Sequence, residues 1–247
     1  MRLYIYYIIS LSIIYSIGCQ NKPASNNQTL ADSAKASAQQ IVPAAFKKGG
    51  DITDEDGNVY HTIIIGKQVW MAENLKVTHY ANGDEIPQVA DDKRWRQLTA
   101  GAYCNYDNNI ANADVYGRLY NWHTITDSRH IAPKGWHIPT DQEWRTLIAY
   151  LGGNAIAGSK LMAAGLNYWE QPNNTATNQS GFSAIPAGNR NNNGAYDNKG
   201  FSATWWTATG EQQADFATNY SVVNNRMAIN EDVDDRVCGL SIRCIKD

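Results

Sequence analysis

Four cysteines are the residues of this sequence that are best suited to covalent or metal chemistry. Cys19 directly follows an apolar N-terminal run, whereas Cys104, Cys238 and Cys244 lie far downstream. In an oxidising compartment thiols pair as disulfides, and free thiolates are ligands for soft metals such as Cu(I). Three downstream cysteines therefore predict one disulfide and one free thiol. We expect Cys104 to pair with Cys244 or with Cys238, because either bond would tie the end of the chain to its middle.

The N-terminal segment predicts export and attachment to a membrane. It has a basic residue, Arg2, and an apolar run over residues 3–17, which is shorter than the about 20 residues that a membrane-spanning helix needs. The sequence Ile17-Gly18-Cys19 resembles the lipobox of bacterial lipoproteins, although Ser16 stands where that motif more often has Leu. The resemblance implies that residues 1–18 are a signal peptide and that Cys19 carries the lipid, which would hold the protein in the cell envelope, in the outer membrane. An uncleaved anchor and an ordinary secretory signal are the alternatives.

Residues 19–50 have the composition of a disordered tether, and residues 51–247 have that of a folded domain. The tether is rich in Asn, Gln, Ser, Ala and Lys, and it cannot bury enough apolar surface to offset the entropy of ordering. Over the whole chain 43% of the residues are hydrophobic and 18% are charged, which is enough apolar material for a core. The net charge of -3 gives no basic surface for nucleic acid, and no nucleotide-binding or zinc motif occurs.

The elements of the domain are predicted by hydrophobic period and turn residues. Residues 59–65 and 68–71 read as a β-hairpin. Thr140 and Glu143 form a capping box before an apolar stripe that ends at Gly152, which predicts a helix, and a second helix is expected over residues 155–164. Short strand-like runs follow at residues 182–185, 201–209, 220–223 and 237–245. Residues 189–200 are rich in Asn and Gly and are expected to form a loop.

Several motifs in this order resemble one known family. They are DEDGNVY at residues 54–60, GKQVWMAENL at 66–75, YGRLYNW at 116–122, GWHIPTDQEW at 135–144, GFSAIPAG at 181–188, Trp205-Trp206, and LSIRCIKD at 240–247. They are similar to the Fibrobacter succinogenes major paralogous domain, which is common in lipoproteins of the Bacteroidetes and Fibrobacteres. Ala132 departs from the family, whose members often have Cys before this Pro-x-Gly-Trp-His segment.

The resemblance implies a branch of the C-type-lectin-like fold, close to that of formylglycine-generating enzymes. The expected fold class is α+β, an irregular domain with small antiparallel sheets, one or two helices and long loops that carry ligand contacts. In this setting the aromatic residues of segment 116–122, with Trp136, are interpreted as core. His137 is interpreted as a hydrogen-bonded structural residue.

A candidate ligand site combines side-chain amides, a guanidinium and two indoles. Such groups suit recognition of a carbohydrate or a peptide. The alternative is a solvated loop over a packed tryptophan pair. The residues of this candidate site are Asn189, Arg190, Asn191, Asn192, Trp205 and Trp206.

Two metal hypotheses are weaker than this ligand site. Residues 230–236 hold four carboxylates, which suit Ca²⁺, but the Glu-Pro-Asn and Trp-Asn-Asp signatures of calcium-dependent lectins do not occur, and a solvated acidic loop is expected. The segment around Cys244 is similar to the copper-binding strand of formylglycine-generating enzymes. However, Cys238 lies six residues before Cys244 instead of five, and one residue of offset reverses the face of a strand.

These observations predict a non-catalytic recognition module at the cell envelope, without a metal or other cofactor, which binds a glycan or a partner protein. One alternative is an oxidase similar to the formylglycine-generating enzymes that uses Cys238 and Cys244 to hold copper. Another is a structural envelope protein without a discrete ligand. A disulfide between Cys104 and Cys244 would oppose the oxidase, because it removes one of the two thiolates.

Overall fold

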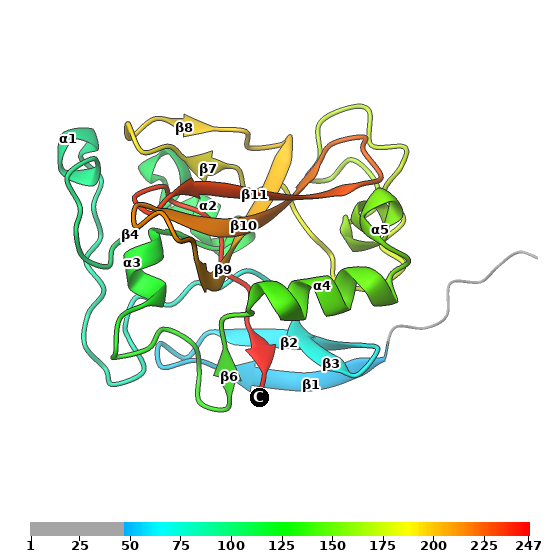
Figure 1. The fold of residues 1–247 in the computed structure, drawn as a ribbon, viewed down its shortest axis with the longest axis horizontal. Helices are drawn as coiled ribbons and strands as arrows, with labels where there is room; N and C mark the ends of the chain where they lie inside the picture. Colours follow the sequence, from blue (N-terminus) through cyan, green and yellow to red (C-terminus); the bar gives the residue numbers. More distant parts are fainter. Residues whose placement is uncertain (1–46) are drawn as a thin grey trace, which may run out of the picture. The chain divides into compact units, whose positions relative to one another are not determined.

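The computed structural model describes residues 47–247. The predicted signal peptide, the predicted lipid-attachment residue Cys19 and residues 20–46 of the predicted tether lie outside the described residues. Figure 1 shows helices and several small antiparallel sheets combined in one α+β arrangement.

Most of the elements are short and are connected by long irregular segments. The helices are α1 (Asp92–Trp95), the 3-10 helix η1 (Tyr106–Asn108), α2 (Ile110–Tyr116), α3 (Trp122–Ile125), α4 (Asp141–Tyr150) and α5 (Asn154–Leu161). The strands are β1 (Lys48–Thr53), β2 (Val59–Ile65), β3 (Gln68–Met71), β4 (Tyr103–Cys104), β5 (Leu119–Tyr120), β6 (Trp136–His137), β7 (Asn189–Arg190), β8 (Tyr196–Asp197), β9 (Ser202–Gly210), β10 (Phe216–Val223), β11 (Ile229–Asp235) and β12 (Ile245–Lys246).

The largest sheet joins both ends of the domain. Its strand order is β1-β2-β3-β12-β6, so the C-terminal strand β12 lies between β3 and β6, with Ile245 opposite Trp70 on one side and His137 on the other. The predicted hairpin of β2 and β3 is confirmed. Strand β1 begins at Lys48, within the segment predicted as tether, because residues 48–53 complete the sheet by pairing with β2. The ordered domain therefore begins before the predicted boundary at residue 51.

A second sheet has the order β11-β10-β9. Its edge strand β11 contains most of the acidic segment that was predicted to be a loop, and that prediction is wrong. The carboxylates are tolerated in a strand because β11 has a free edge and most of its side chains are exposed. The predicted loop at residues 189–200 likewise contains a small hairpin of β7 and β8.

Helix α4 connects the two larger sheets through an aromatic core. Its predicted capping box is confirmed, with Thr140 and Glu143 each bonding the other's backbone N–H. The helix lies between the sheet of β1–β3 and the sheet of β9–β11 (Figure 1). Trp144 packs at centroid distances of 5.0 Å from Trp70, 5.7 Å from Trp205 and 5.1 Å from Tyr220. The apolar stripe of α4 therefore holds both sheets together.

Helix α5 follows α4 after a turn at Gly152 and Gly153. It covers most of the predicted second helix but ends at Leu161, because Met162 is extended and forms a parallel bridge with Ala184. This bridge holds the segment around residue 163 beside residues 181–185.

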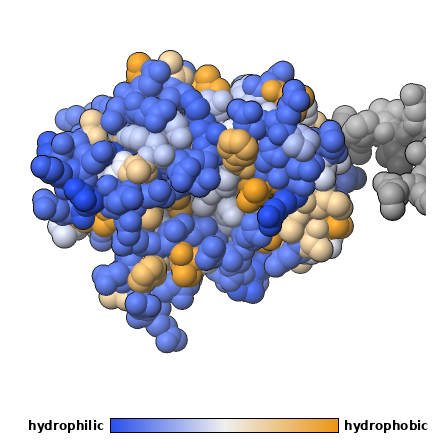
Figure 2. All heavy atoms as spheres, turned by 90° about the horizontal axis from the view of Figure 1, so that it is seen from above, coloured by the Kyte–Doolittle hydropathy of each residue, from blue (hydrophilic) through white to orange (hydrophobic). Residues whose placement is uncertain are grey.

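The face of the domain in Figure 2 is mostly hydrophilic, and its apolar side chains form small, separate groups. That view offers no broad apolar surface of the kind that permanent interfaces use. Within residues 47–247, the structure contains no helix with the length and apolar character that crossing a membrane requires.

Candidate functional site

The predicted indole pair does not face solvent. Trp205 and Trp206 are both fully buried. The indole N–H of Trp205 donates to Asn74 Oδ1 at 2.9 Å, and that of Trp206 donates to the carbonyl oxygen of Tyr120 at 2.9 Å. Strand β9 forms the middle of the core, so both indoles are enclosed there. These two tryptophans are structural, and the prediction that they bind a ligand is wrong.

Arg190 is also fully buried, and four of its five N–H donors are bound to protein acceptors, in contrast to its predicted role in ligand binding. Its guanidinium donates to the carbonyl oxygens of Gly194, Val89 and Ala90, and its Nη2 lies 2.7 Å from a carboxylate oxygen of Asp92. These contacts connect the β7–β8 hairpin to the segment before α1.

The three asparagines of the predicted site lie near the surface and bond other protein groups. Asn189 donates to Asn191, and Asn192 donates to a carboxylate oxygen of Asp235 at 3.2 Å. The structure therefore does not bring the six predicted residues together as one exposed site.

The three downstream cysteines are buried free thiols, so the structure lacks the expected bond between Cys104 and Cys244. Cys104 packs with Trp95 and Leu119, Cys238 packs in another cluster with Trp206, and Cys244 packs in a third. Burial raises the pKa of Cys104 to about 11 and that of Cys238 to about 12. Because Cys238 and Cys244 belong to different clusters, the structure does not pair them as the copper hypothesis requires.

The aromatic motif and His137 have the predicted structural roles. Tyr120 is fully buried and Trp122 is nearly so. His137 Nδ1 lies 2.7 Å from Asp247 and its Nε2 lies 2.8 Å from Glu143, so the imidazole joins the C-terminus to the start of α4. Burial lowers the pKa of His137, but the bonds to Asp247 and Glu143 outweigh burial and raise it.

A pocket of about 720 Å³ lies over β1 and β2 and is closed on its other side by α2 and by the segment from residue 163 to residue 185. We call it the β1–β2 pocket. Its walls are mainly apolar, with a few charged groups. The residues that define it are Lys48, Asp51, His61, Ile63, Glu73, Val115, Ala163, Tyr168, Ser183, Ile185 and Arg243.

Arg243 is the buried charged residue of this pocket. It is fully buried, its guanidinium lies 4.1 Å from the centre of the Phe182 ring, and its Nε and Nη2 both donate to Asn74 Oδ1, at 3.2 and 3.0 Å. Nη1 donates to the carbonyl oxygen of Phe182. Burial lowers the pKa of Arg243 to about 9, against the opposing effect of Glu73, so the group remains a cation at neutral pH. Among residues 47–247 no carboxylate lies within ion-pair distance of it.

The other charged groups of the pocket lie toward solvent. Glu73 bonds His61 twice, to Nδ1 at 2.7 Å and to the backbone N–H at 2.9 Å. The hydrogen bond from Glu73 is the main cause of the raised pKa of His61. Lys48 and Asp51 are exposed on β1. A cation therefore lies in the buried part of the pocket, and the carboxylates lie at its exposed margin.

The apolar walls come from segments that are distant in sequence. Val115 on α2 and Tyr168 are 50% and 42% exposed, which is high for large apolar groups and leaves their surface free for contact. The Tyr168 ring meets Tyr116 edge-on at 6.3 Å, so α2 supports this wall. The sequence placed Arg243 beside Cys244 in a strand-like run, but the copper hypothesis directed attention to the thiols.

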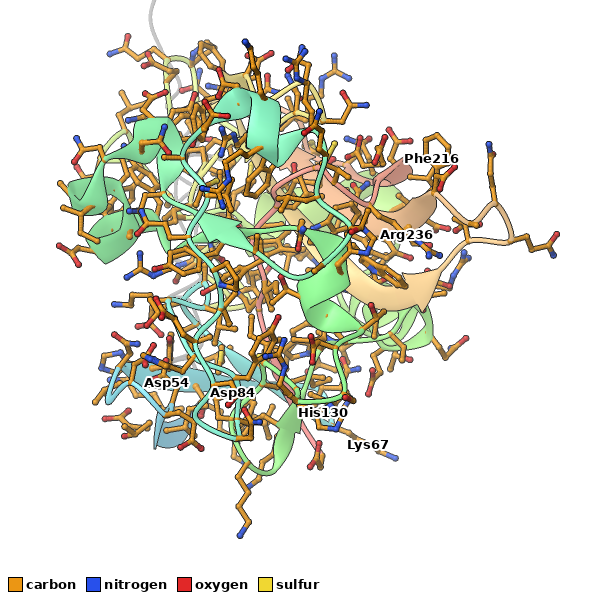
Figure 3. The ribbon with its side chains drawn as sticks, turned by 90° about the vertical axis from the view of Figure 1, so that its left-hand side faces the viewer. Asp54, Lys67, Asp84, His130, Phe216 and Arg236 are labelled. Atoms are coloured by element: carbon orange, nitrogen blue, oxygen red, sulfur yellow. The ribbon has the colours of Figure 1, made fainter. Side chains whose placement is uncertain are left out.

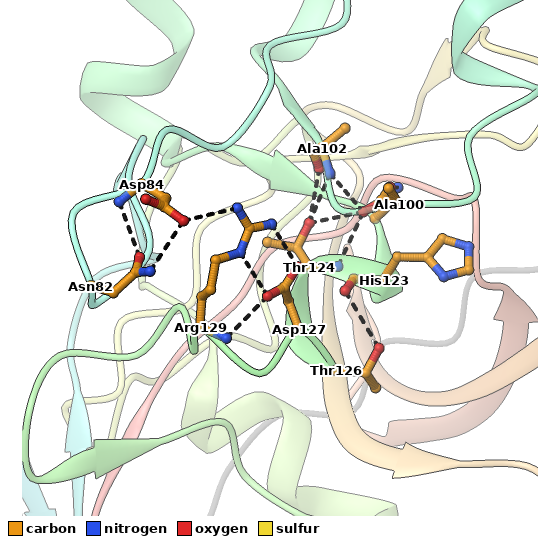
Figure 4. Close-up of polar contacts among 10 residues, drawn as sticks. Asn82, Asp84, Ala100, Ala102, His123, Thr124, Thr126, Asp127 and Arg129 are labelled. Carbon is orange, nitrogen blue, oxygen red and sulfur yellow. Dashed lines mark hydrogen bonds and ion pairs between the residues drawn. The ribbon is translucent and has the colours of Figure 1, made fainter.

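Another arginine, Arg129, has its charge paired with carboxylates of the protein. It lies 2.7 Å from Asp127 and 3.3 Å from Asp84 (Figure 4). Its guanidinium also stacks on Tyr80 at 4.0 Å. These bonds lower the pKa of Asp127 to about 2. Arg129 therefore joins two loops and has its anionic partners within the protein.

A smaller hollow of about 390 Å³ lies at one end of the β9–β11 sheet, where Phe216 and Arg236 are neighbours (Figure 3). Arg236 donates to the carbonyl oxygen of Phe216 at 3.1 Å and stacks on Trp122 at 4.2 Å. His123 also lines the hollow, and burial lowers its pKa, as does Arg236. Of the Arg236 donors only Nε is used in these contacts, so its terminal nitrogens remain available, but the apolar contact surface at this hollow is smaller than in the β1–β2 pocket.

The comparison with protein families identifies the family of this chain. Residues 63–246, about three quarters of the chain, match the model of the Fibrobacter succinogenes major domain. The chain belongs to this family. No curated protein and no solved structure gives a significant match. Glu73 and Arg243 lie within the Fibrobacter succinogenes major domain, whereas Lys48, Asp51 and His61 precede the matched residues.

The described residues also contain no group of three or more His, Cys, Asp or Glu side chains arranged to hold a metal ion. The side chains of the β1–β2 pocket combine an apolar contact surface with a buried, positively charged hydrogen-bond donor.

Proposed function

We propose that this protein is a lipid-anchored envelope protein whose domain recognises a ligand without transforming it, and that the β1–β2 pocket is the binding site. The observation that carries this proposal is Arg243, a buried guanidinium that lines an open, largely apolar pocket. Binding sites commonly combine apolar walls with a few well-placed polar groups. The ligand belongs to a partner protein or to a glycan at the cell envelope.

The state of the cysteines supports recognition over thiol chemistry. A reactive cysteine needs an accessible thiolate, and its surroundings usually lower its pKa. Here burial raises the pKa of all three downstream thiols. At neutral pH they are protonated, and each contributes to apolar packing.

Two further parts of the proposal come from the sequence. The lipobox-like sequence at Cys19 supports a diacylglyceryl anchor in the outer membrane, and residues 20–46 would separate the domain from the lipid. The proposal includes a C-type-lectin-like architecture, because that fold combines small antiparallel sheets, few helices and long connecting segments, as this domain does.

Anchoring is tested by the Cys19→Ser variant of the full-length chain, produced with a radiolabelled fatty acid. We expect the variant to leave the membrane fraction and to lose the label, because serine has no thiol for lipid attachment. Ser25→Ala is the matched control in the same segment and should keep both properties. A labelled Cys19→Ser protein in the membrane fraction would refute the anchor.

Recognition is tested by applying the full-length protein to arrays of glycans and of envelope-protein peptides. Tyr168→Ala removes a wall of the β1–β2 pocket, and Tyr150→Ala removes a tyrosine that is 66% exposed on α4 and does not line it. We expect binding that Tyr168→Ala weakens and Tyr150→Ala preserves. Equal binding by both variants would place the site elsewhere. An array with no bound member would favour the structural envelope protein.

A further inference from the structure

We infer that the β1–β2 pocket accepts a carboxylate carried on an apolar body, and that the C-terminal residue of a partner protein is the ligand group that fits it. This inference rests on the proposed function and specifies its ligand. Three features of the pocket carry it: the spare hydrogen-bond donors of Arg243, the charges at the pocket margin, and the hydrocarbon groups of its walls.

The guanidinium of Arg243 has donors to spare. Arginine has five N–H donors. Three contacts are formed with described residues, two to Asn74 Oδ1 and one to the carbonyl oxygen of Phe182. One hydrogen therefore remains on each terminal nitrogen, Nη1 and Nη2. A carboxylate takes two parallel N–H donors of this kind in a bidentate pair, and the bond is strengthened by the charge.

A negative charge would also offset the cost of burying this cation. The acceptors of the Arg243 guanidinium in the structure, an amide oxygen and a backbone carbonyl oxygen, are neutral. A buried charge without an ionic partner is costly, and a ligand carboxylate would supply the partner from outside the chain. Glu73 lines the same pocket but is held by two bonds to His61, away from ion-pair distance of Arg243.

The margin of the pocket favours a single negative charge. Asp51 and Glu73 both line it, and they would repel a dianion such as a phosphate group or a strongly acidic peptide. A carboxylate that reaches Arg243 with an uncharged body behind it avoids this repulsion. Lys48, also on the exposed margin, adds a long-range electrostatic attraction for the carboxylate.

The walls favour an apolar body over a sugar ring. Ile63, Val115 and Ile185 offer hydrocarbon contact. The hydroxyl of Thr62 already donates to the carbonyl oxygen of Gly50 at 2.8 Å, and that of Ser183 donates to Gly181 at 3.2 Å. An acidic sugar would place several hydroxyl groups against these hydrocarbon walls, and each hydroxyl buried there without a partner would cost free energy. The last residue of a protein with an aliphatic side chain has the required chemistry.

The test is calorimetric titration of the full-length protein with N-acetyl-L-leucine, which carries the carboxylate of a C-terminal residue. Its neutral analogue N-acetyl-L-leucinamide and the acidic sugar methyl glucuronide are titrated in parallel. We expect the amide to bind about tenfold or more weakly than the acid, because it lacks the charge-assisted bonds. We expect the glucuronide also to bind more weakly than N-acetyl-L-leucine.

Two pairs of variants connect the binding to Arg243. Arg243→Lys should lose most of the preference for acid over amide, and Arg145→Gln, on the exposed face of α4, should keep it. Ser183→Asp places a carboxylate on the wall of the folded pocket and should weaken binding of the acid, whereas the neutral Ser183→Asn should not. This second pair remains informative if Arg243→Lys does not fold.

Each alternative result overturns the inference in a distinguishable way. Equal binding of acid and amide would show that the carboxylate does not contribute to recognition. Tighter binding of the glucuronide would show that the pocket prefers a sugar to an apolar body. No binding of N-acetyl-L-leucine at millimolar concentrations would reject this ligand class. The proposed function would survive that result if the arrays still showed binding that depends on Tyr168.

Discussion

Two fully buried arginines, Arg190 and Arg243, differ in the groups that accept their hydrogen bonds. Arg190, in β7, donates to three backbone carbonyls and pairs with Asp92. Arg243, just before β12, has only the neutral acceptors Asn74 and Phe182. Both stack on aromatic rings, at 4.4 Å from Trp95 and 4.1 Å from Phe182, so stacking does not distinguish them.

The difference lies in what surrounds the spare donors. Arg190 uses four of its five N–H donors, whereas Arg243 uses three and borders a pocket of about 720 Å³. A buried cation whose partners are all internal stabilises the fold that encloses it. We expect a buried cation with free donors at the wall of a pocket to bind a ligand that enters this pocket.

The largest expected effect comes from Arg190→Met. The substitution leaves the carbonyl oxygens of Val89 and Gly194 without their buried donor, removes one of the two donors to Ala90 and removes the pair with Asp92. We expect the free energy of unfolding to fall by about 3–5 kcal/mol, measured by urea denaturation. A loss below about 1 kcal/mol would show that Arg190 does not have the structural role proposed for it.

Arg243→Met should cost less. It leaves one carbonyl oxygen unpaired, but Asn74 Oδ1 keeps its bond from the indole of Trp205, and a buried charge without a carboxylate partner disappears. We expect a loss of about 1–3 kcal/mol in the same urea experiment, together with loss of carboxylate binding. If the loss equals or exceeds that of Arg190→Met, the two arginines have equivalent structural roles.

Ser183→Asp should make Arg243 resemble Arg190 by supplying an internal carboxylate. Ser183 follows Phe182, whose carbonyl oxygen already accepts from Arg243, and its φ of 56° is one that aspartate tolerates. Relative to Ser183→Asn, we expect a gain of about 1 kcal/mol in the free energy of unfolding at neutral pH. A lower stability for the aspartate variant would show that its carboxylate does not reach the guanidinium.

The smallest effect is expected at His137. Its imidazole pairs with Glu143 and Asp247 of the same chain, and all three side chains are partly exposed. Because the folded-state pKa of His137 is raised above its ordinary value of 6.5, its stabilisation is fully present below that value and is lost as pH rises through the folded-state pKa. We expect His137→Gln to cost about 0.5–1 kcal/mol at pH 5.5 and less at pH 8. The exposed His130→Gln is the control, and a cost that does not change with pH would contradict the ion pairs.

The sequence was sufficient for elements that depend on local patterns. The capping box of Thr140 and Glu143 and the β2–β3 hairpin have signatures within a few residues of one another, and both are confirmed. The pairing of β12 between β3 and β6 joins segments that lie more than 100 residues apart, and no local pattern encodes it.

The site was predicted less well than the fold, for a physical reason. Asn189, Arg190, Trp205 and Trp206 were grouped because their chemistry suits recognition, but composition does not reveal that the indoles and the guanidinium are buried. Arg243 was visible in the sequence only as the neighbour of Cys244. Its importance arises from the free donors and the pocket, which exist only after β2, α2 and the segment after α5 have come together.

The central claim is tested most directly by the side-chain NMR resonances of the two buried arginines. The Nε–Hε signals of the full-length protein are assigned by their disappearance in Arg190→Met and Arg243→Met, and N-acetyl-L-leucine is then titrated. We predict a saturable shift of the Arg243 signal and an unchanged Arg190 signal, because only Arg243 has free donors at the pocket. Saturable binding that leaves the Arg243 signal unchanged, or that shifts both signals alike, would contradict the account.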